Sequence, residues 1–165
     1  MTGAQGRRFE LRAHTADVAV AATGETLEDV FAAVADGLAA ASCDDIPDGV
    51  GERETLSVTA ESREALLFDY LDELIYLRDV RVALPVDHRV DSIERPDGER
   101  ESESEWSLEA SARNVPLTEV DAREVKAVTY SEMRLERVGG EDERTAADGD
   151  ESDDGGWEAY VVFDV

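Results

Sequence analysis

The residues best placed to bind a cation are two aspartates near opposite ends of the chain. Asp164 precedes Val165, so a side-chain carboxylate lies next to the carboxylate of the chain end. Asp17 follows the polar residues 14–16, between two segments that are typical of strands. Two aspartate oxygens with a terminal carboxylate or carbonyl oxygen suit a hard cation such as Ca²⁺ or Mg²⁺. From spacing alone a plainer interpretation stays open, in which Asp17 forms the turn and Asp164 is a solvated chain end.

Two further side chains, His14 and Lys126, are candidates for contact with a partner. A histidine and an aspartate in one turn usually form a structural hydrogen-bonded pair, so His14 is not predicted to be a catalytic base. Lys126 is the only lysine in a chain with 15 arginines. A retained lysine indicates a position that needs a compact ammonium, suited to a phosphate or carboxylate of a partner, although chance retention is the alternative.

The sequence carries no signature of an enzyme. It contains neither the G-x-x-x-x-G-K-[ST] phosphate-binding loop nor the G-x-S-x-G nucleophile motif. Its single cysteine, Cys43, excludes a disulfide within the chain and a cysteine-based zinc site, and is expected to be a small buried side chain. We therefore expect a protein that is not itself an enzyme.

The net charge of −25, from 41 acidic and 16 basic residues, restricts the possible partners. Binding of nucleic acid depends on Lys and Arg that neutralise phosphates, so direct nucleic-acid binding is not expected. A basic membrane-binding patch is excluded in the same way, and no apolar run is long enough for a signal peptide or a membrane span. The expectation is a cytoplasmic protein.

The acidic surface also predicts adaptation to molar salt, as in a halophilic archaeon. At 1 M salt the Debye length is roughly 3 Å, so repulsion among carboxylates is largely screened. An acidic disordered protein is the alternative, but apolar periodicity along most of the chain argues against it.

The elements that position these residues indicate one α+β domain over residues 1–165, with two amphipathic helices packed on a largely antiparallel sheet. A helix capped by Thr26 and a second helix that begins after Ser62 each carry an apolar stripe at spacings of three and four. Alternating apolar residues predict strands, of which 82–90 and 106–112 form a hairpin. The strand segments are 9–13, 18–22, 56–60, 82–90, 106–112, 124–135 and 157–165.

Two further expectations concern the last third of the chain. Residues 139–156 hold eight acidic residues and no large apolar side chain, which predicts a mobile acidic insertion. Residues 157–165 are apolar at successive positions, so Ala159, Val161 and Phe163 face one way and Tyr160 and Val162 the other. This pattern predicts a central strand that is covered on both faces.

Five blocks, in order along the chain, resemble the archease family. They are H-T-A-D at 14–17, T-L-E-D-V-F at 26–31, L-L-F-D-Y-L-D-E-L-I-Y at 66–76, E-V-K-A-V-T-Y at 124–130 and F-D-V at 163–165. The resemblance covers nearly the whole chain and implies an archease-like fold of the strand-helix-strand-strand type. The departures from the family pattern are the acidic insertion and the general acidity of the surface.

The resemblance implies a non-catalytic cofactor of the tRNA-splicing RNA ligase. Such a protein promotes guanylylation of the ligase catalytic subunit, restores multiple turnover and can broaden the nucleotide that the ligase accepts. It also implies a bound divalent metal, calcium first, with magnesium or manganese as alternatives. The matching ligand positions are Asp17, Asp164 and Val165, while Lys126 and His14 fall at positions expected to act in ligase activation.

Three other functions stay open on the sequence. A chaperone or specificity modulator of a tRNA methyltransferase is also associated with this family. A metal-dependent hydrolase that uses Asp17, Asp164 and His14 lacks the expected base and nucleophile. The third alternative is a plain ion-binding or interaction module, which the fold would equally allow.

Overall fold

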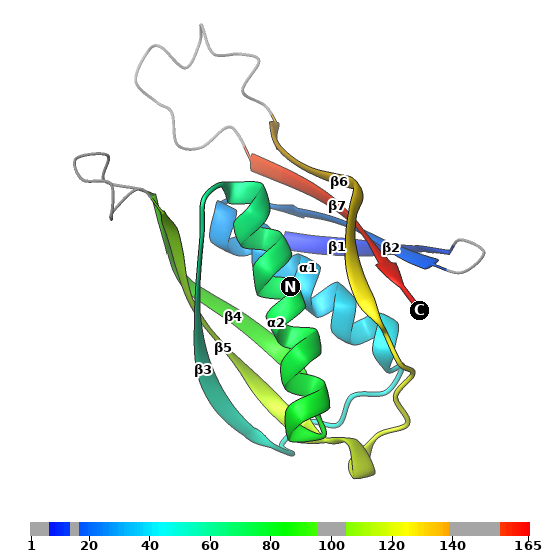
Figure 1. Cartoon of the computed structure of the whole chain (residues 1–165). Coiled ribbons are helices and arrows are strands. Elements are labelled where there is room, and N and C mark those ends of the chain that lie inside the picture. Colours follow the sequence, from blue (N-terminus) through cyan, green and yellow to red (C-terminus); the bar gives the residue numbers. More distant parts are fainter. Residues whose placement is uncertain (1–6, 14–16, 96–104, 139–155) are drawn as a thin grey trace, which may run out of the picture.

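Two helices pack against two antiparallel sheets in the computed structural model, which describes residues 7–13, 17–95, 105–138 and 156–165 (Figure 1). The four-stranded sheet has the order β1 (Arg7–Ala13), β2 (Asp17–Gly24), β7 (Gly156–Asp164), β6 (Ala127–Val138). The three-stranded sheet has the order β3 (Glu52–Ala60), β5 (Trp106–Pro116), β4 (Ala83–Glu94). The helices are α1 (Leu27–Ser42) and α2 (Arg63–Arg81), and a short 3-10 helix, η2 (Leu117–Glu119), follows β5.

Both helices begin at the predicted caps. The Thr26 hydroxyl accepts a hydrogen bond from the Asp29 N–H, and the Ser62 hydroxyl accepts one from the Ala65 N–H, each at 3.0 Å. These bonds satisfy N–H groups that the first turn of a helix leaves free. The α+β class with two capped helices is therefore confirmed.

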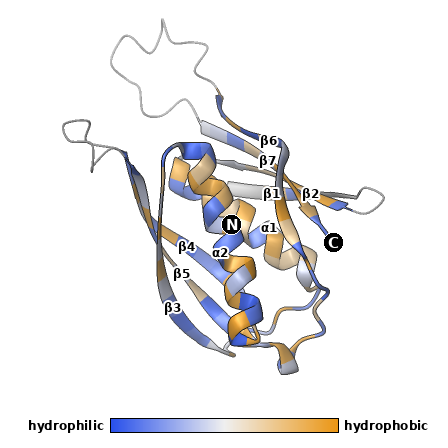
Figure 2. Cartoon of the chain, in the orientation of Figure 1, coloured by the Kyte–Doolittle hydropathy of each residue, from blue (hydrophilic) through white to orange (hydrophobic). Residues whose placement is uncertain are grey.

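The two helices are buried to different extents. Helix α1 contacts β1, β2 and β7 of one sheet and β4 of the other, so it is buried nearly all round and not along one stripe. Helix α2 contacts β6 and the three-stranded sheet but keeps one side free. Figure 2 shows the consequence, since α1 is mostly hydrophobic along its length while α2 alternates between hydrophobic and hydrophilic bands.

One main core joins both sheets and both helices. Phe31 of α1, Tyr70 of α2 and Phe163 of β7 are among its largest fully buried side chains. A smaller cluster, which includes Cys43, lies beneath the loop after α1. Cys43 is buried, as the sequence predicted, and His88 is buried as well. No helix in the described part of the chain is long and apolar enough to cross a membrane.

Strand β7 is central, between β2 and β6, as predicted. Its Ala159, Val161 and Phe163 enter the core. The prediction that both faces are covered is wrong at Tyr160, which is only half-buried and lines an open groove on the outer face of the sheet. Other strands of the sheet present charged residues there, such as Glu10 of β1 and Arg134 of β6, in place of an apolar layer.

Two expectations about the strands are corrected by the structure. The strands form two sheets instead of one. Val82, expected in the hairpin strand, instead ends α2 in the left-handed conformation (φ 53°) and is exposed. The β4–β5 hairpin itself is confirmed, with an irregular register near Asp87, which also has a positive φ.

The acidic insertion 139–156 lies outside the described residues except for Gly156, which begins β7.

Replacing Gly37 by alanine is expected to destabilise the fold. An added Cβ would lie 2.6 Å from Cγ1 of Val20, where α1 crosses β2. Overpacking a core costs about 1–3 kcal/mol, and the better helix propensity of alanine returns at most about 1 kcal/mol. The unfolding free energy is therefore expected to fall by up to about 2 kcal/mol, measured by urea denaturation in molar KCl. A Gly37→Ala variant more stable than the wild type would contradict this prediction, because β2 would then shift to accommodate the added methyl group at no cost.

A candidate acidic site at the end of the four-stranded sheet

The register of the four-stranded sheet brings two of the predicted metal ligands together. Asp17, the first residue of β2, lies directly opposite Asp164, the last residue of β7. Directly opposed residues of antiparallel strands point to the same face, with Cβ atoms about 4.5–5.5 Å apart. The two carboxylates therefore lie side by side at one end of the sheet.

The main chain of Lys126, just before the start of β6, lies beside Asp164 at the same end of the sheet. The Lys126 N–H donates a hydrogen bond to the Asp164 carbonyl oxygen at 2.7 Å, just before Ala127 pairs with Asp164 at the start of β6. The Lys126 side chain is exposed and forms no ion pair with the described residues. The Lys126 ammonium is therefore unpaired within the described part of the chain.

The paired carboxylates are not neutralised by the described part of the chain. Neither Asp17 nor Asp164 makes a side-chain hydrogen bond or ion pair there, and both are partly exposed. Like charges directly opposite each other across two strands are destabilising. A bound cation would remove this repulsion.

The donor atoms fit a hard divalent cation but supply only part of its coordination shell. Carboxylate and main-chain oxygens are the ligands that Ca²⁺ and Mg²⁺ prefer, and both ions also keep water ligands. Val165, which follows Asp164, is exposed and has main-chain oxygens at the same corner. Among the residues that the structure describes, no three His, Cys, Asp or Glu side chains are grouped closely enough to hold a metal by themselves. His14 lies outside the described residues.

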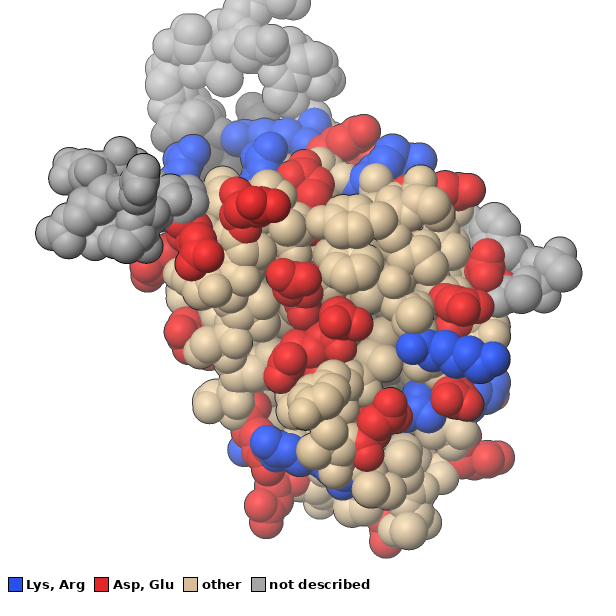
Figure 3. Space-filling model, in the orientation of Figure 1, with Lys and Arg blue, Asp and Glu red and all other residues tan. Residues whose placement is uncertain are grey.

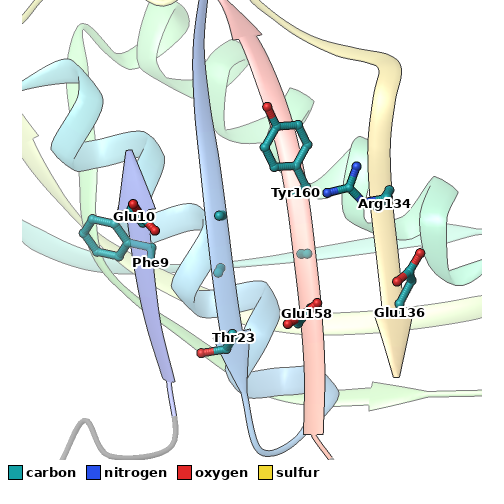
Figure 4. A pocket seen from close by; sticks show the side chains of 10 residues that line it. Phe9, Glu10, Thr23, Arg134, Glu136, Glu158 and Tyr160 are labelled. Carbon is teal, nitrogen blue, oxygen red and sulfur yellow. The ribbon is translucent and has the colours of Figure 1, made fainter. Parts of the chain in front are cut away.

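The open groove beside Tyr160, which the sequence did not predict, lies on the outer face of the same sheet (Figure 4). It has a volume of about 570 Å³ and is lined by Phe9, Glu10, Thr23 and Tyr160, among others. The Arg134 guanidinium lies 4.7 Å from the centre of the Tyr160 ring, a cation–π contact. In the sequence, Glu158 and Tyr160 alternate with the buried residues of β7. This alternation could have predicted that both side chains lie on the face away from the helices.

The fold and the acidic corner together define a class of protein: a single α+β domain whose terminal strand is central and ends in a carboxylate pair shared with β2. Comparison with known proteins agrees with this class. The model of the Archease protein family matches residues 9–165. The chain belongs to the archease family.

Relatives and solved structures span nearly the whole chain. Protein archease of Methanosarcina mazei is 34% identical over 98% of each chain. Protein archease of Thermococcus gammatolerans is 35% identical over 96% of this chain and 99% of its own. The solution structure of Methanobacterium thermoautotrophicum protein 1598 superposes with a TM-score of 0.70 at 27% identity, covering 95% of this chain and 98% of that one.

The crystal structure of an archease from Thermotoga maritima, which is described as a possible chaperone, has the same fold. Its TM-score is 0.52 at 21% identity, and the match covers 94% of this chain and 98% of that one. The archease resemblance inferred from the sequence motifs is confirmed, and so is the fold that it implied.

Proposed function

We propose that this protein activates a tRNA-splicing RNA ligase by promoting guanylylation of the ligase catalytic subunit and supporting multiple turnover, and that it alters the nucleotide specificity of the ligase. The observation that carries the proposal is the pairing of Asp17 with Asp164, with the Lys126 main chain bound to Asp164. Residues from three distant segments, each matched to a family motif, meet at one corner. Two adjacent carboxylates suit contact with a cationic surface, and an exposed lysine whose main chain lies beside them suits contact with a nucleotide phosphate.

Asp17, Asp164 and Val165 would hold a divalent cation, with calcium the first candidate and magnesium or manganese the alternatives. When bound, the cation supplies a positive charge that favours phosphate oxygens. The described carboxylates fit this role because they are adjacent, partly exposed and unpaired within the described part of the chain.

The charge of the protein favours contact with the ligase and not with the tRNA. A ligase that binds RNA and a nucleotide needs a positively charged cleft, and a chain with net charge −25 is complementary to it. Lys126 would contact a phosphate, either of the nucleotide or of the RNA end, because an ammonium forms strong hydrogen bonds with phosphate oxygens.

A guanylylation assay tests the proposal. The cognate ligase is incubated with labelled GTP and Mn²⁺ or Mg²⁺ in molar KCl, with and without this protein, and ligated product is counted over several turnovers. Guanylylated ligase that forms faster, with more than one product per ligase, supports the proposal. An unchanged rate, with both proteins shown to be folded, contradicts it.

Lys126 offers a test of the phosphate contact. Hydrogen bonds to charged groups are worth about 1.5–3 kcal/mol, so Lys126→Ala is expected to reduce stimulation about 10- to 100-fold. Lys126→Arg keeps the positive charge and is expected to retain part of the stimulation. The measurement is the initial guanylylation rate at saturating concentrations of each variant. Equal rates for Lys126→Ala and the wild type would remove Lys126 from the site.

The second candidate function is a chaperone or specificity modulator of a tRNA methyltransferase. It is favoured by the description of the Thermotoga maritima archease as a possible chaperone and by the exposed apolar side chains of α2 in this chain. Suppression of methyltransferase aggregation by this protein in the presence of a chelator, with no effect of Asp164→Asn, would support it. Loss of suppression in the same variant would tie the activity to the acidic corner instead.

A further inference from the structure

The free side of α2 exposes large apolar side chains. Tyr76 is 58% exposed and Val80 56%, and they lie four residues apart on the helix. Asp72 and Asp79 are exposed four residues before and three residues after Tyr76, and Asp69 is exposed three residues before Asp72, so these carboxylates follow the same side of the helix. Figure 3 shows acidic side chains scattered among tan ones on the face over α2, with the blue Lys and Arg side chains mainly toward the edges of this view.

An irregularity in β6 brings the aromatic ring of Tyr130 to this side of α2. Thr129 pairs with Val162 of β7 and Arg134 pairs with Tyr160, so residues 130–133 lie opposite Val161 alone. Within this bulge Tyr130 has no partner on β7, and its ring stacks on Phe68 of α2, with ring centres 4.4 Å apart and planes 8° from parallel. Tyr130 is still 51% exposed, so one ring face remains open to a partner. We call Phe68, Asp69, Asp72, Tyr76, Asp79, Val80 and Tyr130 the α2 surface.

The rings of the α2 surface have acidic neighbours. Burial together with Asp69, Glu64 and Glu61 raises the pKa of the Tyr130 hydroxyl. Burial and the neighbouring Asp72 raise the pKa of Asp69. None of Asp69, Asp72 and Asp79 forms an ion pair with the described residues. The carboxylates of this surface therefore lack a cation from the described chain.

Other aromatic rings of the protein are matched with arginine. Arg63 lies 5.0 Å from the centre of the Trp157 ring, and Arg95 lies 5.9 Å from that of Trp106, while Arg134 covers Tyr160. No such cation–π contact to Phe68, Tyr76 or Tyr130 occurs within the described residues. The α2 surface combines open rings with free carboxylates, which is the chemistry that binds a guanidinium.

We propose that the α2 surface is a docking site for a basic protein segment that presents arginine side chains between apolar ones. Arginine would stack on Tyr76 and Tyr130 and pair with Asp69 and Asp72, while apolar side chains of the segment would cover Val80. Nucleic acid is disfavoured because its phosphates would face carboxylates. A second copy bound through the same surface would place these carboxylates against each other.

The test uses a capped peptide of alternating arginine and leucine, titrated into the full chain in molar KCl and followed by backbone amide NMR. High salt suppresses general attraction to the acidic surface. We expect shift changes concentrated at the α2 surface, and weaker binding when lysine replaces arginine in the peptide. Shift changes spread over the acidic surface, or none at residues 68–80 and 130, would overturn the proposal. The assay contains no ligase, so its outcome is independent of the proposed function.

Variants give the same test a matched control. Exposed cation–π contacts are worth about 0.5–1 kcal/mol each, so Tyr76→Ser/Tyr130→Ser is expected to weaken peptide binding about 5- to 30-fold. The control Glu136→Gln/Glu158→Gln removes two carboxylates from the outer face of the four-stranded sheet and should bind as the wild type does. Equal binding by the tyrosine variant, or equal weakening in the control, would overturn the proposal.

Asp69→Asn separates a docking role from a structural one. Because the pKa of Asp69 is raised, its charge is disfavoured in the folded state, and the neutral amide should leave stability unchanged or higher. A lost exposed ion pair predicts binding weaker by about 2- to 5-fold. Undiminished peptide affinity of this variant would contradict the assignment of Asp69 to the docking site.

Discussion

Replacing Asp164 by asparagine is expected to abolish stimulation of ligase guanylylation while the protein stays folded. The asparagine side chain keeps the shape of the aspartate but removes one of the two adjacent anions, so the corner should no longer hold the divalent cation that we propose for it. Changes to the surroundings of a metal already cost 10- to 100-fold in affinity or activity, so loss of a ligand is expected to cost at least about 100-fold. The guanylylation rate in molar KCl measures the effect.

The fold of this variant should be at least as stable as that of the wild type. Removing one of two opposed like charges relieves a cross-strand repulsion worth a few tenths of a kcal/mol to about 1 kcal/mol. The control is Glu158→Gln, which neutralises a carboxylate on the same strand and the same face and should keep full stimulation. Stimulation by Asp164→Asn at the wild-type rate would contradict the role of the carboxylate pair.

Asp17→Asn is expected to have the same effect as Asp164→Asn, and the double variant should be no worse than either. Residues that act as one site are non-additive, because the first substitution already removes the bound group. Two partial and independent losses would instead indicate that the carboxylates contact the ligase separately.

The second large effect expected is the loss of the fold at low salt. In dilute buffer the repulsion within a chain of net charge −25 is unscreened, whereas in molar KCl it is confined to about 3 Å. The structure identifies two places where this repulsion is strong, since Asp17 faces Asp164 and Glu136 faces Glu158 directly across paired strands. A far-UV circular dichroism titration from molar KCl downward should show cooperative unfolding.

The opposed glutamates provide the control for this prediction. Glu136→Gln/Glu158→Gln removes one of the two repulsive pairs and should lower the KCl concentration at the unfolding midpoint. The stability of the wild type and of the variant both rise with KCl concentration, but the variant stays folded at a lower KCl concentration than the wild type. An unchanged spectrum of the wild type in dilute buffer would contradict the adaptation to salt.

Much of the secondary structure follows from local signals in the sequence. The caps at Thr26 and Ser62 and the apolar stripes behind them define the helices, because capping and periodic burial act over a few residues. The successive apolar residues of the terminal strand correctly predicted its central place between β2 and β6, although not the open face at Tyr160. The prediction for Val82 was wrong because this residue continues an alternating apolar pattern in the sequence, whereas in the structure it ends α2 in the left-handed conformation.

The functional surfaces depend on contacts between segments that are distant in the chain. The sequence alone nominated Asp17, Asp164 and Lys126, but only the pairing of β2, β7 and β6 makes them neighbours. Strand register is set by the packing of whole sheets, and a shift of one residue would turn Asp164 to the other face.

The same reason explains what the sequence left unseen. Nothing in the period of residues 124–135 shows that four of them leave the ladder with β7, which is what carries Tyr130 onto Phe68. The open groove at Tyr160 likewise depends on the charged residues that adjacent strands place beside it. Composition and local pattern therefore determined the acidic surface, the helices and the central strand. Tertiary structure decided which side chains share a site, because side-chain proximity across strands arises from non-local pairing.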